Sequence, residues 1–193
     1  MRPGATAAAR RGGRATTIGG ELLIWSEAAG TRGTRWREGL KRDGVLVRSL
    51  LLEVSAAGRP TRLEMTTAAG LLTLHPEPDE SELHGNVVGP DGITHLAFPW
   101  SGDHELLILG SPASATITLR RLTPALVVGA TRTLEVLRIG DELDPRPARW
   151  GVERIARQAW HLREIGGSEE RRLTLDDEGR PHLTDAVSWP LET

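Results

Sequence analysis

The sequence predicts an all-β, mainly antiparallel protein, built as a half-barrel or barrel of consecutive hairpins around a hydrophobic cavity. Two observations lead to this fold class. Short runs of alternating apolar and polar residues recur along the chain, and turn signals rich in Gly, Pro and Asp separate them. Short strands at close spacing are typical of antiparallel barrels and sandwiches. The 193 residues suit one domain.

The N-terminal residues differ in composition from the rest. Residues 1–17 are rich in Ala, Arg and Gly, so we expect a flexible basic tail there and a single antiparallel β domain over residues 18–193. Outside the central region, the expected strands lie at residues 21–25, 35–40, 45–54, 61–67, 71–75, 114–122, 131–139, 171–175 and 182–189. Residues 150–165 fit both a helical and a strand period, and periodicity alone leaves both open.

The chain is organised around residues 82–110, where turns at 89–92 and 101–103 separate three short strands. A first hairpin that pairs Val88 with Ile93 places Asn86 opposite His95, with His84 on the same face. Carried through the second turn, this register predicts that His104, Leu106 and Ile108 join that face. Imidazoles and a carboxamide among aliphatic side chains are typical of a ligand cavity, and equally of a half-solvated sheet.

These residues are the candidate site. His95, His84 and Asn86 are the candidate catalytic residues, because an imidazole exchanges protons near neutral pH and a carboxamide can hold a developing oxyanion. The candidate ligand-binding residues are Trp100, His104, Leu106, Ile108, Arg120 and Trp160, where indole offers a flat apolar surface with one donor. In a strand, the neighbours Arg120 and Arg121 face opposite ways, so at most one points inward.

Several function classes are disfavoured. No metal is expected, because the third histidine lies too far along the predicted sheet for zinc, and no cofactor is expected, because no glycine-rich phosphate loop joins a strand to a helix. A formal net charge of −2 disfavours nucleic acid. The absence of cysteine excludes disulfides and thiolate chemistry. The chain lacks a run of about 18 apolar residues and a secretory signal, so we expect a cytoplasmic protein without integral membrane association.

The C-terminal half carries short motifs in a distinctive order, which are Arg120-Arg121-Leu122, a strand from Thr131, Arg157-Gln158-Ala159-Trp160 and the closing stretch 172–190. In this order of motifs the chain resembles a family of glycolipid-binding proteins. The resemblance implies an antiparallel sheet curled into a half-barrel around a hydrophobic cavity, similar to carriers of lipoproteins and glycolipids. It also implies that residues 150–165 form a strand.

Two functions follow as expectations. The first is binding of a hydrophobic or amphipathic small molecule, glycolipid-like, lipid-like or polyketide-like, in the concave face of the sheet. The alternative is a cofactor-independent enzyme of specialised metabolism, such as a cyclase or isomerase, that uses histidine acid–base chemistry in the same cavity. The sequence indicates no oligomeric state.

Overall fold

The computed structural model describes residues 10–17, 19–177, 179 and 181–183. Over these residues, fourteen strands and one helix form two sheets, so the predicted all-β class is confirmed. The large sheet has the strand order β1 to β8, with every neighbouring pair antiparallel. Its strands are β1 (Arg10–Thr16), β2 (Leu22–Gly30), β3 (Gly33–Arg42), β4 (Val45–Ser55), β5 (Pro60–Thr67), β6 (Gly70–Pro76), β7 (Glu82–Gly89) and β8 (Gly92–Pro99).

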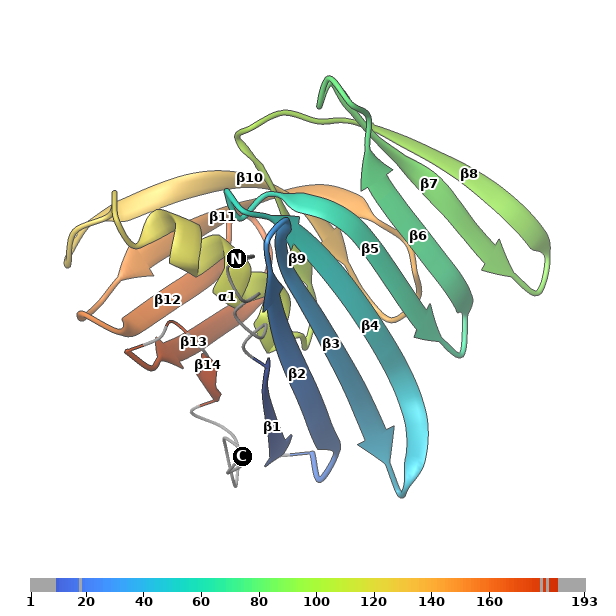
Figure 1. The fold of residues 1–193 in the computed structure, drawn as a ribbon, viewed down its shortest axis with the longest axis horizontal. Helices are drawn as coiled ribbons and strands as arrows, with labels where there is room; N and C mark the ends of the chain where they lie inside the picture. Colours follow the sequence, from blue (N-terminus) through green and yellow to red (C-terminus); the bar gives the residue numbers. More distant parts are fainter. Residues whose placement is uncertain (1–9, 18, 178, 180, 184–193) are drawn as a thin grey trace, which may run out of the picture.

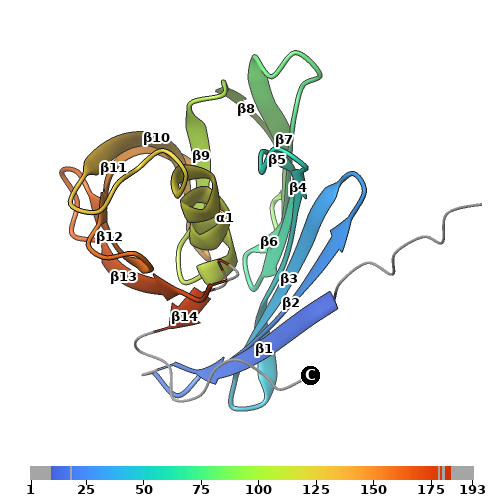
Figure 2. The same ribbon diagram turned by 60° about the vertical axis from the view of Figure 1, so that its left-hand side comes forward.

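The small sheet has the order β14-β13-β12-β11-β10-β9 and curls into a half-barrel (Figure 2). Its strands are β9 (His104–Ile108), β10 (Thr131–Ile139), β11 (Arg146–Arg154), β12 (Ala159–Glu164), β13 (Glu170–Leu175) and β14 (Pro181–Leu183). All neighbours are antiparallel except β9 and β10, which are parallel. Parallel strands need a long crossover connection, and helix α1 (Pro112–Leu122) lies within it.

Helix α1 lies between the two sheets and is buried on both sides (Figures 1 and 2). Ala113 and Ile117 belong to the core cluster shared with the large sheet. Ala115, Leu119 and Leu122 belong to a second cluster with the apolar side chains of β10 to β13. The concave side of the half-barrel is therefore packed with helix side chains.

The prediction of a strand at residues 114–122 was wrong, because this segment is helix α1. Its start carries a signal that the alternation of Thr and aliphatic residues masked. Ser111 is the N-cap and Pro112 stands in the first turn, where its missing N–H costs nothing. Burial on two faces removes the usual amphipathic period, and the threonines are paired locally, as Thr116 donates to the Pro112 carbonyl oxygen at 2.7 Å.

The prediction of a second hairpin across the turn at 101–103 was also wrong. The first hairpin has the predicted register, since Val88 pairs with Ile93 and Asn86 with His95. After the turn at 101–103, however, β9 leaves the large sheet and pairs with β10, so that His104 lies beside Glu135. The near-continuous apolar run of β9 is typical of a strand buried on both faces, and four of its five residues are buried.

Three other expectations concern the ends of the chain and one ambiguous segment. Residues 10–16 of the expected tail form strand β1 and pair with β2, while residues 1–9 lie outside the described part. The expected last strand is β14, Pro181–Leu183, and the remainder of 182–189 lies outside the described residues. Residues 150–165 contain no helix, but they are a hairpin rather than the single strand that the family resemblance implies: 150–154 belong to β11, 159–164 form β12, and 155–158 connect them.

Candidate functional site

The predicted histidine face lies on the outer side of the large sheet. His95 is exposed, and its Nδ1 lies 2.6 Å from Oδ1 of Asn86. Nε2 of His84 lies 3.0 Å from a carboxylate oxygen of Glu77. The inner side of the same hairpin carries Leu83, which is 1% exposed. The register of these side chains was predicted correctly, but at the surface His95 pairs with Asn86 and His84 with Glu77, and their catalytic role stays a prediction.

The predicted ligand-binding residues lie in separate places. Trp100 is buried, stacks on His104 with 5.5 Å between ring centroids, and has the Arg59 guanidinium 5.8 Å from its ring. Leu106 and Ile108 face the core between the sheets, and Trp160 fills the core of the half-barrel. None of these five predicted residues lines the two clefts described next, whereas Arg120 does.

The inner face of the large sheet carries buried charges that the sequence reasoning missed. Glu27 continues the inward phase of Leu23 and Trp25 on β2, and Glu38 lies between Trp36 and Leu40 on β3. The sequence contains a signal for these buried charges, because each carboxylate occupies a strand position that alternation assigns to the buried face.

Arg48 on β4 is the third such residue, in phase with Leu50 and Leu52. A register shift follows its pairing with Leu40, so a bulge lies beside it. Helix α1 runs over these charges, because the Ala113 N–H contacts Glu38 and Arg120 reaches Glu27. Each helix end therefore faces a buried carboxylate.

At the C-terminal end of α1, a cleft of about 430 Å³ opens between the helix and the large sheet. We call it the C-terminal cleft. Its lining includes the apolar side chains of Trp36, Val54 and Ile117, two alanines and several glycines. Arg120 and Arg121 are the charged side chains among its lining residues in the described part of the chain. Because α1 is a helix, neighbouring residues are not forced to opposite faces, and both arginines reach one cleft.

Each arginine of the C-terminal cleft is held by a carboxylate behind it. Arg120 donates from Nη1 to Glu27 at 2.6 Å and from Nε to the Gly179 carbonyl oxygen. Its guanidinium also lies 5.0 Å from the Trp36 ring centroid, a cation–π contact. Arg121 pairs with Glu105, whose other carboxylate oxygen accepts from Thr118 at 3.0 Å. The guanidinium groups are thus fixed while about a quarter of each side chain stays exposed.

Besides its partner Glu105, Arg121 has further charged residues nearby. Burial lowers the pKa of the Arg121 guanidinium, and the nearby charges of Arg59 and Arg132 lower it further, whereas Asp103 raises it. Desolvation and like charges both disfavour the charged form of a group. A bound anion would offset the repulsion between these cations, in addition to the Glu105 carboxylate that already pairs with Arg121.

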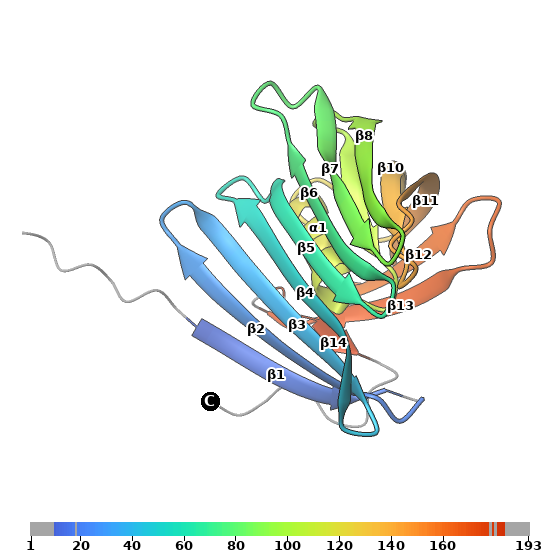
Figure 3. The same cartoon turned by 90° about the vertical axis from the view of Figure 1, so that its right-hand side faces the viewer.

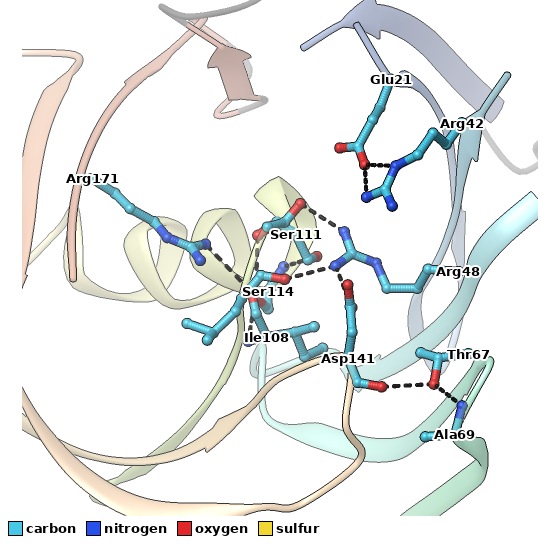
Figure 4. Close-up of polar contacts among 12 residues, drawn as sticks. Glu21, Arg42, Arg48, Thr67, Ala69, Ile108, Ser111, Ser114, Asp141 and Arg171 are labelled. Carbon is cyan, nitrogen blue, oxygen red and sulfur yellow. Dashed lines mark hydrogen bonds and ion pairs between the residues drawn. The ribbon is translucent and has the colours of Figure 1, made fainter. Parts of the chain in front are cut away.

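At the other end of the helix lies a larger cleft of about 700 Å³, the N-terminal cleft. Figure 4 shows its polar contacts, with the Arg48 guanidinium at the centre. Arg48 is 3% exposed and donates to the carbonyl oxygens of Leu109 at 2.7 Å and Gly110 at 2.8 Å, and to Asp141 at 3.1 Å. These bonds fix the connection from β9 to α1. Four arginines and four acidic residues line the cleft, so its lining charge is balanced.

Behind the N-terminal cleft, Glu38 is buried against the first turn of α1. Its Oε1 accepts from the Ala113 N–H at 2.8 Å. Burial raises the pKa of the Glu38 carboxyl, and this outweighs the lowering by the Ser111 hydroxyl, the Arg48 charge, the Ala113 N–H and the Arg171 charge. A carboxyl shifted in this way is a candidate proton donor.

The pKa shift of Glu38 has a consequence for stability that a Glu38→Gln variant tests. A carboxyl whose pKa is raised on folding binds more protons in the folded state than in the unfolded state, between its unfolded pKa near 4.5 and its higher folded pKa. The free energy of unfolding therefore falls as pH rises through that window. The glutamine side chain of the variant does not titrate, so we expect the free energy of unfolding of Glu38→Gln, minus that of the native protein, to increase as the pH rises from 4 to 8. Urea unfolding at a series of pH values measures this difference. A constant difference across this range would contradict the raised pKa.

Comparison with known proteins shows the fold. No family model and no curated protein matches the sequence. Among solved structures, the chain is similar to a DUF1089 family protein from Pseudomonas aeruginosa, with a TM-score of 0.55 and 17% sequence identity. The match covers 98% of this chain and 92% of that chain. At this identity the likeness shows a shared arrangement of strands, and the glycolipid-binding resemblance of the short motifs stays a prediction.

Two features are absent from the part of the chain that the structure describes. The described residues contain no cluster of three or more His, Asp or Glu side chains placed to hold a metal ion. The single helix of the described chain is too short and too polar to cross a bilayer.

Proposed function

We propose that the protein binds an amphipathic small molecule with an acidic group, and that the C-terminal cleft is its binding site. The observation that carries the proposal is that Arg120 and Arg121 line one cleft together with Thr34, Ser55 and a majority of apolar and glycine residues. Ligand sites of small molecules are mostly apolar pockets with a few placed polar groups. Binding of an amphipathic small molecule is the function that the sequence predicts. The proposed site is the C-terminal cleft and not the histidine face of the β7–β8 hairpin.

The two arginines have hydrogen-bonding capacity left for a ligand. A guanidinium carries five N–H donors. Arg120 donates from Nε to Gly179 and from Nη1 and Nη2 to Glu27, which leaves one further N–H on each η nitrogen. A carboxylate or phosphate that accepts from them forms charge-assisted bonds in a partly desolvated place. The aliphatic or ring part of the ligand then packs on Trp36, Val54 and Ile117.

Decanoate is a suitable probe for this site, with titration calorimetry as the readout. Loss of Arg120 alone removes the guanidinium that pairs with the Glu27 carboxylate, so the variant of choice is Glu27→Gln with Arg120→Gln. We expect it to bind decanoate at least 10-fold more weakly than the native protein, because a hydrogen bond to a charged group contributes about 1.5 to 3 kcal/mol. Arg37→Gln is the matched control, because Arg37 is exposed on the outer face of the same sheet.

The outcome that would refute the site is equal decanoate affinity in the native protein and the Glu27→Gln, Arg120→Gln variant, with both proteins folded by circular dichroism. Equal affinity for decanol and decanoate would instead refute the acidic group, since decanol has the same chain without the charge.

A cofactor-independent enzyme is the second candidate function, and Glu38 is the observation that favours it. Glu38 is buried beside the N-terminal cleft and its pKa is raised by burial, as suits a general acid, whereas His95 lies exposed on the outer side of the sheet. In this candidate function, Glu38 exchanges a proton with a substrate in the N-terminal cleft through Ser111, which lines that cleft. Compounds that co-purify with native protein and with Glu38→Gln would then differ as isomers. The same compound in both would remove the enzyme candidate.

A further inference from the structure

Apart from Pro99 at its end, strand β8 lacks the features that protect the free edge of a sheet. In the described part of the chain, β8 ends the large sheet and pairs with β7 alone (Figure 1). Its eight residues, Gly92–Pro99, include no Asp, Glu, Lys or Arg, and six of them are exposed. Its pairing with β7 has no register shift, so no bulge bends it away. Edge strands of soluble proteins are usually protected by charges, bulges or a covering element.

The other sheet edges differ from β8. Strand β1, at the opposite end of the large sheet (Figure 3), carries the exposed Arg11 and Arg14. In the small sheet, β9 is mostly buried and β14 has three residues. Of the edges that the structure describes, β8 therefore combines length, exposure and lack of charge.

We propose that β8 pairs antiparallel with β8 of a second copy of this chain, across a two-fold axis at Leu96. The two large sheets then join into one continuous sheet. This inference is independent of the proposed ligand site, because none of the β8 residues lines either cleft.

The backbone of β8 supports this register. Gly89 and Gly92 close a two-residue hairpin loop, so they form a hydrogen-bonded pair. Hydrogen-bonded and non-hydrogen-bonded pairs alternate along an antiparallel ladder, so Ile93, His95 and Ala97 direct their N–H and C=O groups to the free edge. With the axis at Leu96, His95 lies opposite Ala97 of the second copy, and the two residues exchange both hydrogen bonds.

The side chains favour the axis at Leu96 over a neighbouring one. Leu96 and Phe98 lie on the inner side of β8, where they are partly buried and pack against the core cluster. The axis at Leu96 places the two leucines in a non-hydrogen-bonded pair, where side chains are closest, and places Phe98 opposite Thr94. An axis at His95 would instead place two imidazoles opposite each other.

A second copy is the favoured occupant because the strand is complementary to itself. A two-fold axis places like residues near each other, so an edge with charges of one sign repels its own copy. Strand β8 carries no such charge, and its inner apolar row continues across the axis.

Single cysteines read the register directly, since the chain contains none of its own. Residues in a non-hydrogen-bonded pair have Cα atoms about 4.5 Å apart, within the range for a disulfide. We expect Leu96→Cys to form a disulfide-linked dimer under mild oxidation, seen on non-reducing gels. Ala97→Cys is the matched control, because its copies lie diagonally and beyond reach. Equal linking of both variants, or linking of His95→Cys in preference, would overturn the proposal.

Light scattering at increasing concentration tests the native assembly. We expect a mass that rises from 21.0 kDa towards twice that value, and a Thr94→Lys variant that stays monomeric. A dimer that survives Thr94→Lys uses another surface and overturns the proposal. A native protein that stays monomeric at all concentrations also overturns the proposal. In that case, slow hydrogen exchange of the outward β8 amides would show that another segment of the chain covers the edge.

Discussion

Replacing Arg48 with methionine is expected to lower the free energy of unfolding by about 3 kcal/mol or more. The substitution removes a buried cation that holds the carbonyl oxygens of Leu109 and Gly110 at the start of α1. Both acceptors then lose their charged donor in a place where water replaces it poorly. Urea unfolding followed by tryptophan fluorescence measures the change.

Asp141→Asn provides the contrast for Arg48. Asp141 is 58% exposed, so loss of its charge is expected to change the free energy of unfolding by less than about 1 kcal/mol. If Arg48→Met were as mild as Asp141→Asn, the connection before α1 would not depend on the buried guanidinium.

The second large effect is expected at Glu105, which is 1% exposed on β9. Replacing it with leucine leaves the Arg121 cation and the Thr118 hydroxyl without their partner at the interface of α1 and β9. Breaking a buried ion pair from one side costs about 3 to 5 kcal/mol. We expect a loss of that size in chemical unfolding.

The double variant Glu105→Leu with Arg121→Met separates pairing from packing. Apolar replacement of both partners of a buried pair is often neutral. We therefore expect the double variant to recover most of the stability lost by Glu105→Leu. A double variant as unstable as the single one would show that the Glu105 side chain stabilises the protein through packing or geometry, and not through its ion pair with Arg121.

Most strands were predictable because each buries one face. The inward residues of β4, from Leu50 to Val54, alternate with outward ones, and period two makes such a strand readable without its neighbours. The register of the first central hairpin was predictable for a similar reason, since its two-residue loop fixes which residues pair.

The departure of β9 from the large sheet was not predictable from local pattern. The turn at 101–103 suits a hairpin, and the choice between pairing with β8 and pairing with β10 depends on residues about 30 positions later in the sequence. The helix after β9 was hidden because it is buried on both sides, so Ile117 and Leu119 give it no single apolar face. Only the Ser111-Pro112 start signalled it.

The candidate site followed the same limits. Once residues 114–122 were read as a strand, Arg120 and Arg121 had to face opposite ways, and the cleft that both arginines line had no place. The buried carboxylates behind them were readable in part, because Glu27 stands where the alternation of β2 calls for an apolar residue. Its partner on helix α1 could not be predicted, because the contact between Glu27 and Arg120 joins residues 93 positions apart in the sequence.

Native mass spectrometry of the protein after exposure to a bacterial lipid extract tests whether the C-terminal cleft binds an acidic amphiphile. We expect an adduct of an acidic amphiphile on the native protein and on Arg37→Gln, and its loss from the Glu27→Gln, Arg120→Gln variant. Equal adducts on all three proteins, or adducts of neutral compounds only, would contradict an acid-binding cleft at the C-terminal end of α1.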